Sequence, residues 1–144
     1  MPEPPYIRDA DGQIRPGEMA SAAAVGLFDL AGLDLSFLRI DHQVRLHLGQ
    51  TEVVIEAAFH FKVLDFEYAM DPADRSQLGP LLDVYPDQLE SAEIDAGGTL
   101  RLSFARGGQI RVPPDPMYEA WQIVGPGTRL IVCPPGGERL AVWR

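Results

Sequence analysis

Apolar and polar side chains alternate along much of the chain after residue 33, which is typical of strands with one buried face. The longest alternation, Ser36 to Leu48, predicts one long strand. Gly49 to Thr51 predicts a turn, and Glu52 to Val63 predicts the returning strand. Its expected core face is Val53, Ile55, Ala57, Phe59, Phe61 and Val63.

The register of this hairpin follows if Leu48 lies opposite Val53. Apolar side chains then meet on one face of the sheet. On the other face, the same register predicts two favourable cross-strand pairs. These pairs are Arg45 with Glu56, and Asp41 with His60.

A meander of three strands is predicted over Gln88 to Asp95, Thr99 to Ala105 and Gln109 to Pro113. The loops Ala96–Gly98 and Arg106–Gly108 have the length and the terminal glycine of a type I turn with a bulge. The resulting register predicts three apolar pairs: Ile94 with Leu100, Leu102 with Val112, and Phe104 with Ile110.

Prolines organise the last third of the chain. Pro113, Pro114 and Pro116 predict an extended connector over Val112 to Met117. Three short antiparallel strands follow, separated by turns rich in glycine and proline. The expected pairs in the last hairpin are Val132 with Leu140, and Leu130 with Val142.

The remaining segments are less regular. Residues 1–17 predict a tail or a docked arm, and Pro16 to Leu30 predicts a helix ending near Gly32. Asp65 to Asp74 is expected to be a loop, and Ser76 to Val84 a short helix capped by Ser76 or Gln77. The predicted fold class is α+β, mainly antiparallel β: a curved sheet or partly closed small barrel with one or two short helices. The expected organisation is an N-terminal arm over 1–32 and a single mainly-β domain over 33–144.

Composition restricts the function classes. The chain has 144 residues and a formal net charge of −9, which argues against binding to nucleic acid or to an anionic membrane. The same charge permits a basic protein partner, and solubility alone also explains it. The single cysteine excludes an internal disulfide framework and fits a cytoplasmic location.

The C-terminal third carries a resemblance. PPDPMYEAWQIVGPG, followed by LIVCPPGGERLAVW, resembles the C-terminal signature of a family of small bacterial proteins of unknown function common in high-GC actinobacteria. RIDHQVRLHL, Arg39 to Leu48, is similar to that family's first strand. The resemblance covers about Leu33 to Trp143; it implies a fold and assigns no catalytic residue.

The candidate binding residues are Asp115, Tyr118, Glu119 and Trp121, where acids and aromatics stand beside a rigid proline segment. The alternative is structural: the aromatics close one end of the core, and the acids cap backbone amides. The parity of Trp121 with Ile123 predicts that Trp121 is buried and Tyr118 exposed.

Other residues with functional chemistry are weaker candidates for a site. His42 is expected on an apolar strand face, and Cys133 is expected to be a buried structural thiol. Asp41 and His60 could act as a general base on a polar sheet face, but the favoured interpretation is a solvated face held by ion pairs. We predict no catalytic residue, metal site or cofactor.

The sequence therefore favours a small non-enzymatic module that binds another protein. One form is an immunity protein whose acidic surface neutralises a basic toxin. The alternatives are an enzyme using the Asp41/His60 face or Cys133, and a ligand-binding domain with a pocket between sheet and helix. That pocket would be lined by Phe59, Phe61 and Trp121.

Overall fold

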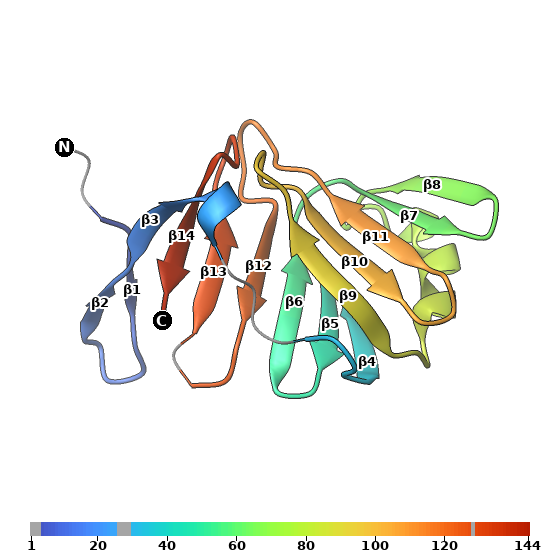
Figure 1. Cartoon of the computed structure of the whole chain (residues 1–144), viewed down its shortest axis with the longest axis horizontal. Helices are drawn as coiled ribbons and strands as arrows, with labels where there is room; N and C mark the ends of the chain where they lie inside the picture. The colour runs from blue at the N-terminus through green and yellow to red at the C-terminus, as the bar shows by residue number, and fades with distance from the viewer. Residues whose placement is uncertain (1–3, 26–29, 128) are drawn as a thin grey trace.

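The computed structural model describes residues 4–25, 30–127 and 129–144, which form three antiparallel sheets (Figure 1). The larger sheet runs, in spatial order, β3 (Glu18–Ser21), β14 (Arg139–Trp143), β13 (Leu130–Cys133), β12 (Trp121–Val124), β6 (Thr51–Ile55), β5 (Val44–Leu48) and β4 (Leu35–Ile40). The second runs β8 (Phe66–Met70), β7 (Phe59–Val63), β11 (Gln109–Val112), β10 (Leu100–Phe104) and β9 (Leu89–Ile94). The third is the hairpin of β1 (Tyr6–Arg8) and β2 (Ile14–Pro16).

Helical structure in these described ranges is limited to three 3-10 segments. They are η1 (Ala22–Ala24), η2 (Arg75–Gln77) and η3 (Gly79–Val84). The protein is therefore mainly antiparallel β, and the α+β label holds only loosely.

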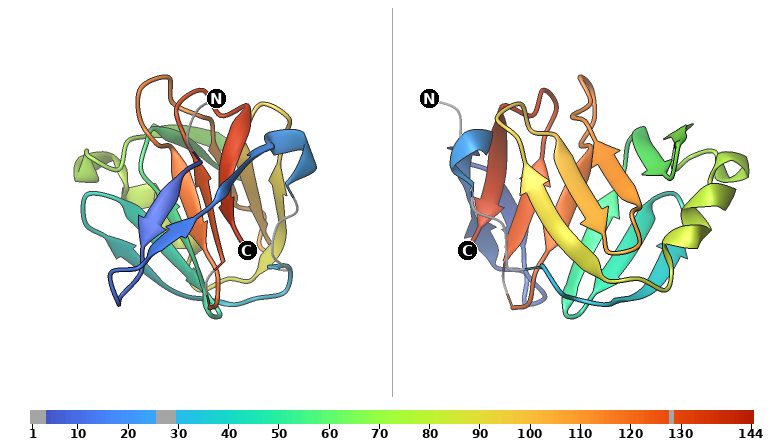
Figure 2. Two further views of the ribbon diagram at one scale, coloured as in Figure 1. Left: turned by 90° about the vertical axis from the view of Figure 1, so that its left-hand side faces the viewer. Right: turned by 45° about the vertical axis from the view of Figure 1, so that its right-hand side comes forward.

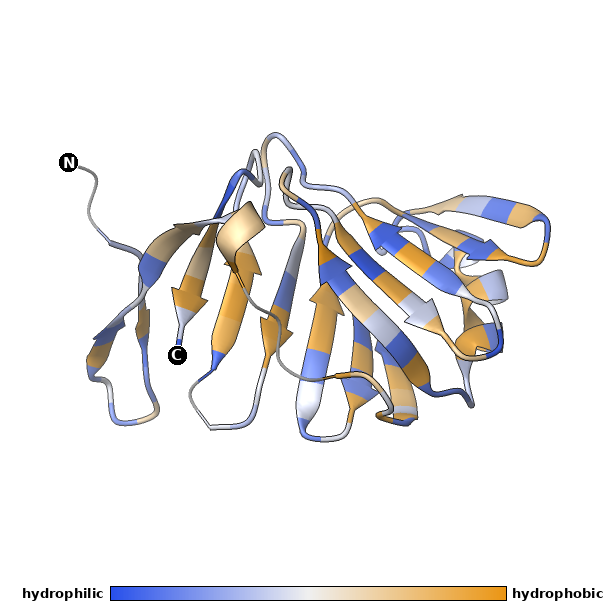
Figure 3. Cartoon of the chain, viewed as in Figure 1, coloured by the Kyte–Doolittle hydropathy of each residue, from blue (hydrophilic) through white to orange (hydrophobic). Residues whose placement is uncertain are grey.

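The main apolar core lies between the seven-stranded and the five-stranded sheets. Leu46 and Ile55 enter it from the first sheet, and Phe61 and Leu102 from the second, all of them fully buried. Figure 2 shows the two sheets as separate layers, and Figure 3 shows apolar and polar residues alternating along their strands. The sheets form a two-layer sandwich rather than the partly closed small barrel that was one of the two expected architectures.

The chain crosses from one sheet to the other between β6 and β7, over residues 56–58. The expected long strand Glu52 to Val63 is therefore two strands in different sheets. Its predicted core face is confirmed, because Phe59 is 1% exposed and Phe61 is fully buried.

The long strand predicted over Ser36 to Leu48 is wrong. The segment is a hairpin of β4 and β5, in which Ile40 lies opposite Val44. Asp41 to Gln43 form its turn, closed by a hydrogen bond from the backbone N–H of Asp41 to the carbonyl of Gln43.

The predicted register between β5 and β6 is wrong by two residues. Leu48 lies opposite Thr51 rather than Val53, because Gly49 and Gln50 alone make the turn. Arg45 consequently faces Val54, so neither Arg45 with Glu56 nor Asp41 with His60 is a cross-strand pair.

The meander of β9, β10 and β11 is confirmed, with Ile94 opposite Leu100 as predicted. The predicted register between β10 and β11 is wrong by two residues, since Leu102 lies opposite Ile110 rather than Val112. Its loop begins one residue earlier than expected: Phe104 bonds to Gly108 across it, and Gly107 takes the positive φ of 98°.

The C-terminal strands β12, β13 and β14 are confirmed, but the last hairpin is shifted by one residue. Leu130 lies opposite Trp143, and Val132 opposite Ala141. A shift of one residue exchanges the faces of a strand. The face carrying these residues packs against Ile7 and Met19 of the N-terminal segment, outside the main core.

The N-terminal segment contains strands where a helix was predicted. Within Pro16 to Leu30, β3 pairs with β14 at the sheet edge and η1 follows; residues 26–29 lie outside the described residues. The expected loop over Asp65 to Asp74 contains β8. The helix expected over Ser76 to Val84 is η2 and η3, where Asp74 rather than Ser76 accepts the capping hydrogen bond.

Candidate functional site

The proline segment before β12 holds Asp115 in local hydrogen bonds. Asp115 Oδ1 accepts the backbone N–H groups of Met117 (2.8 Å) and Tyr118 (3.0 Å). This capping fits the structural alternative for Asp115. The aromatic ring of Tyr118 remains 68% exposed, and Met117 and Glu119 are also exposed. The segment therefore presents an aromatic and an acidic side chain to solvent.

Trp121 does not belong to that surface. Its side chain is fully buried, which confirms the parity prediction for Trp121 and Tyr118. The indole Nε1 donates to the carbonyl of Gly98 at 3.0 Å. Trp121 therefore connects β12 to the β9–β10 loop within the core.

Cys133 lies beside this contact and is also fully buried. Its Sγ is 3.7 Å from the carbonyl oxygens of Gly98 and Pro134. Burial, with a further contribution from the charge of Glu119, raises the pKa of Cys133 to about 12. A thiol that stays protonated near neutral pH is a poor nucleophile.

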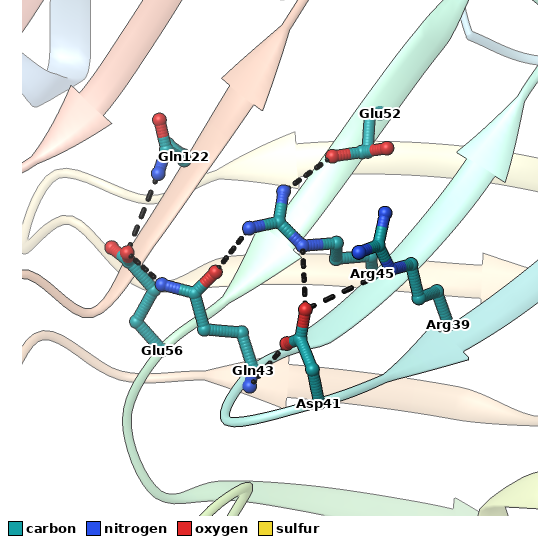
Figure 4. A network of polar contacts seen from close by, with 7 residues as sticks. All are labelled: Arg39, Asp41, Gln43, Arg45, Glu52, Glu56 and Gln122. Carbon is teal, nitrogen blue, oxygen red and sulfur yellow. Dashed lines mark hydrogen bonds and ion pairs between the residues drawn. The ribbon is translucent and has the colours of Figure 1, made fainter.

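A polar network covers the outer face of the seven-stranded sheet over β5 and β6 (Figure 4). Arg45 occupies its centre: its Nη1 is 2.7 Å from Glu52 Oε1, and its Nη2 donates to Gln43 Oε1. Asp41 Oδ2 lies 3.7 Å from Nε of both Arg45 and Arg39. The hydrogen bond from the backbone N–H of Gln43 lowers the pKa of Asp41.

Glu56 closes the network at its other end. Its Oε1 accepts from Gln43 Nε2 (2.6 Å) and Gln122 Nε2 (3.3 Å). Its Oε2 is buried without a hydrogen-bond partner among the described residues. Burial, and then the charge of Glu119, raise the pKa of Glu56.

The residues proposed as a general base are not brought together. Asp41 lies in the β4–β5 turn of the seven-stranded sheet, whereas His60 lies on β7 of the other sheet. His42 is exposed in the same turn rather than placed on an apolar strand face. Phe59, Phe61 and Trp121 are buried in the core and do not line a shared pocket, although Phe61 contributes to the wall of a hollow of about 350 Å³ beside η3. No three His, Cys, Asp or Glu side chains of the described segments form a metal-binding group.

An apolar groove that the sequence did not reveal lies between β4 and η3. It has a volume of about 400 Å³ and is lined by Ser36, Phe37, Leu38, Leu82 and Tyr85. Phe37, Leu82 and Tyr85 are 46%, 55% and 48% exposed. Leu82 lies on the exposed side of η3, whereas its neighbour Leu81 is fully buried. The only available signal was Phe37, a large apolar residue at a polar position of the alternation.

Comparison with known proteins supports the resemblance found in the sequence. A model of a family of unknown function, DUF6188, matches residues 27–144. The chain belongs to DUF6188. No curated protein and no solved structure matches this DUF6188 chain. In the part of the DUF6188 chain that the structure describes, no helix is long and apolar enough to cross a membrane.

Proposed function

We propose that this chain is a non-enzymatic module that binds another protein through the groove between β4 and η3. The observation that carries the proposal is the convergence of Phe37, Leu82 and Tyr85, each about half exposed, in one apolar hollow. Contiguous exposed apolar surface of this kind is characteristic of interaction sites. Aromatic side chains beside a pocket are also the residue type that dominates binding energy.

The groove runs beside an available sheet edge. β4 is the last strand of the seven-stranded sheet. Among the described residues, its outer edge is bonded only at its start, through the bridge of Asp34 to Gln88 and the bond from the Leu35 N–H to the carbonyl of Asp87. An extended segment of a partner would pair with the outer edge of β4 and place alternate side chains in the groove. Backbone pairing supplies affinity in this mode, and the groove supplies specificity.

Charge favours a basic partner. The chain carries a net charge of −9, and Asp83, which is exposed on η3, lies between the groove residues Leu82 and Tyr85 in the sequence. A partner segment with lysine or arginine beside its apolar anchor would be steered to this surface. An immunity-type role, in which the partner is a basic toxin, is one form of this proposal.

A second surface for the same function is the exposed part of the proline segment, Met117 to Glu119. Tyr118 offers an exposed ring for a cation–π contact with a partner's arginine. Glu119 and Asp115 add negative charge beside the ring. Trp121 is buried and would act here only through the fold.

The experiment uses a photo-crosslinking amino acid placed in the native cell at position 82, at position 118, or at position 6 as a control. Tyr6 is 59% exposed on β1, remote in the fold from both surfaces. We expect position 82 to give an adduct with a basic protein and position 6 to give none. The purified partner should then lose at least about tenfold in affinity with Leu82→Ala or Tyr85→Ala, and little with Tyr6→Ala.

Equal adducts at positions 82 and 6, or unchanged affinity in both groove variants, would overturn the proposed groove. An adduct at position 118 alone, weakened by Tyr118→Ala, would move the contact to the second surface. Adducts only with a second copy of this chain would replace the partner by self-association.

A further inference from the structure

The outer face of the five-stranded sheet is hollowed and polar. The hollow has a volume of about 300 Å³, and all five strands of the sheet contribute to its lining. Of the candidate site residues considered from the sequence, His60 lies in this hollow, and the groove beside β4 shares no residue with it. Its side chains are the outward-facing ones, since their strand neighbours Phe61, Leu102 and Ile110 are buried in the core.

Four ionisable side chains form a row across this hollow. His60 lies opposite Arg111, Arg111 opposite Arg101, and Arg101 opposite Glu93. Two arginines directly opposite each other on adjacent strands repel and destabilise the sheet. A local conflict of this kind is expected where a site serves binding at the expense of stability.

The two arginines have weak counter-charges within the protein. Arg111 Nη2 is 3.7 Å from Glu67 Oε1, and Arg101 Nη2 is 3.8 Å from Asp95 Oδ2. These distances exceed those of charge-assisted hydrogen bonds. Both are exposed pairs, which contribute little to stability. Neither guanidinium donates a hydrogen bond to another described side chain, so their donors are available to a ligand.

The next row of the same face supplies further donors. Lys62 lies opposite Gln109, Gln109 opposite Ser103, and Ser103 opposite Ser91. Lys62 is the only lysine of the chain. A cation, an amide and two hydroxyl groups therefore lie beside the two arginines, in a chain whose charge is otherwise strongly negative.

We propose that this hollow binds the anionic group, a phosphate or a carboxylate, of a small polar molecule. The anion would lie between Arg101 and Arg111 with Lys62 beside it, where it relieves their repulsion and accepts planar, paired hydrogen bonds. Glu67 and Glu93 stand at the margins of the hollow. They would accept hydrogen bonds from hydroxyl or amino groups of the ligand and would repel an extended polyanion such as nucleic acid.

The test is a titration of the whole chain with inorganic phosphate, followed by backbone amide NMR. Sodium chloride at equal ionic strength is the reference. We expect saturable shifts at His60, Lys62, Gln109 and Arg111, with a dissociation constant of about 1–10 mM for this minimal probe. The same phosphate should also slow acetylation of Lys62.

Matched variants distinguish binding in this hollow from a general effect of the protein's charge. Arg111→Gln should weaken phosphate binding at least about tenfold and should leave the melting temperature unchanged or higher. Arg39→Gln removes the same charge from an exposed arginine of the other sheet and should leave binding unchanged. Arg101→Gln replaces Arg111→Gln if that variant does not fold.

Shifts that follow ionic strength without saturating would overturn the proposal. Equal losses of binding in Arg39→Gln and Arg111→Gln would also overturn it. With the site established, sugar phosphates and hydroxy acids compared at equal concentration would show whether phosphate or carboxylate is preferred.

Discussion

The indole Nε1 of Trp121 donates a hydrogen bond of 3.0 Å to the carbonyl of Gly98, which lies 23 residues earlier in the chain. This contact joins the first strand of the C-terminal hairpins to a loop of the opposite sheet. Cys133 Sγ approaches the same carbonyl at 3.7 Å. The carbonyl of Gly98 is therefore a point where the two sheets are held together by polar contacts inside an apolar core.

Replacing Trp121 should destabilise the fold. Trp121→Ala removes the largest fully buried side chain and should cost about 3–5 kcal/mol of unfolding free energy. Tyr118→Ala is the control: its ring is exposed, so the change should stay within about 0.5 kcal/mol. Urea unfolding of both variants measures the difference. The reverse order would mean that Tyr118 and not Trp121 supports the core.

Gly98 should tolerate no side chain. Its φ is +93°, and a Cβ there would lie 2.1 Å from the carbonyl oxygen of Gly137. Gly107 is a matched control, with φ +98° and open space around its Cα. Gly107→Ala should cost only the backbone strain, about 1–2 kcal/mol. Gly98→Ala should cost clearly more, because the backbone around Gly137 must also move. Equal midpoints in urea for the two variants would show that the two loops do not pack together.

The sequence predicted correctly which side chains of the C-terminal segment are buried, but it predicted the pairing of several strands wrongly. Alternation placed Trp121 inward and Tyr118 outward, because burial follows parity along one strand. Parity also explains the failure at β4 and β5. Ile40 and Val44 flank a three-residue turn, so the same alternation continues through Asp41 to Gln43 and looks like one strand.

The predicted register is wrong in two further hairpins, β10–β11 and β13–β14, each for its own physical reason. The loop Ala105 to Gly107 is followed directly by a second glycine, and choosing Gly108 as the last loop residue moved the predicted pairing by two residues. At β13, Leu130 to Cys133 are all apolar, so alternation did not distinguish the faces. The second face is apolar because the N-terminal segment covers it, with Ile7 and Met19 in contact.

Neither the groove beside β4 nor the facing pair of arginines could be predicted without the correct tertiary packing and strand register. Phe37 and Tyr85 come from segments brought together only by the packing of η3 beside β4. Arg101 and Arg111 face each other only in the observed register. The predicted register would have placed Arg101 opposite Pro113, and the repulsion would not have been recognised.

Cys133 should react slowly with thiol reagents in the native protein, since it is buried and its pKa is raised to about 12. Native labelling should accelerate in urea in parallel with unfolding. The raised folded-state pKa stabilises the fold below the pKa of the unfolded chain, and this contribution is lost as pH rises toward 12. The stability advantage of the wild type over Cys133→Ala should therefore shrink above about pH 9. Fast labelling at neutral pH would contradict this account.

The final prediction concerns the charge on Glu56. Burial and the charge of Glu119 raise the pKa of Glu56, so ionisation of this carboxyl opposes folding. A group whose folded-state pKa is raised stabilises the fold fully below its unfolded pKa, and this contribution is lost as pH rises through the folded-state value. Glu56→Gln removes the charge and keeps an oxygen that can accept from Gln43 and Gln122.

The variant should therefore gain stability relative to the wild type at pH 7. The gain should shrink as the pH falls through the raised folded-state pKa of Glu56 and should be lost below about pH 4, where the wild-type carboxyl is protonated in the folded and the unfolded chain. Glu52→Gln is the matched control. Glu52 accepts a 2.7 Å hydrogen bond from Arg45, so loss of its charge should destabilise the protein at pH 7. Thermal unfolding of the three proteins at pH 4 and pH 7 measures both effects. If Glu56→Gln is less stable than the wild type at pH 7, the attraction of Arg45 outweighs burial and the repulsion by Glu119.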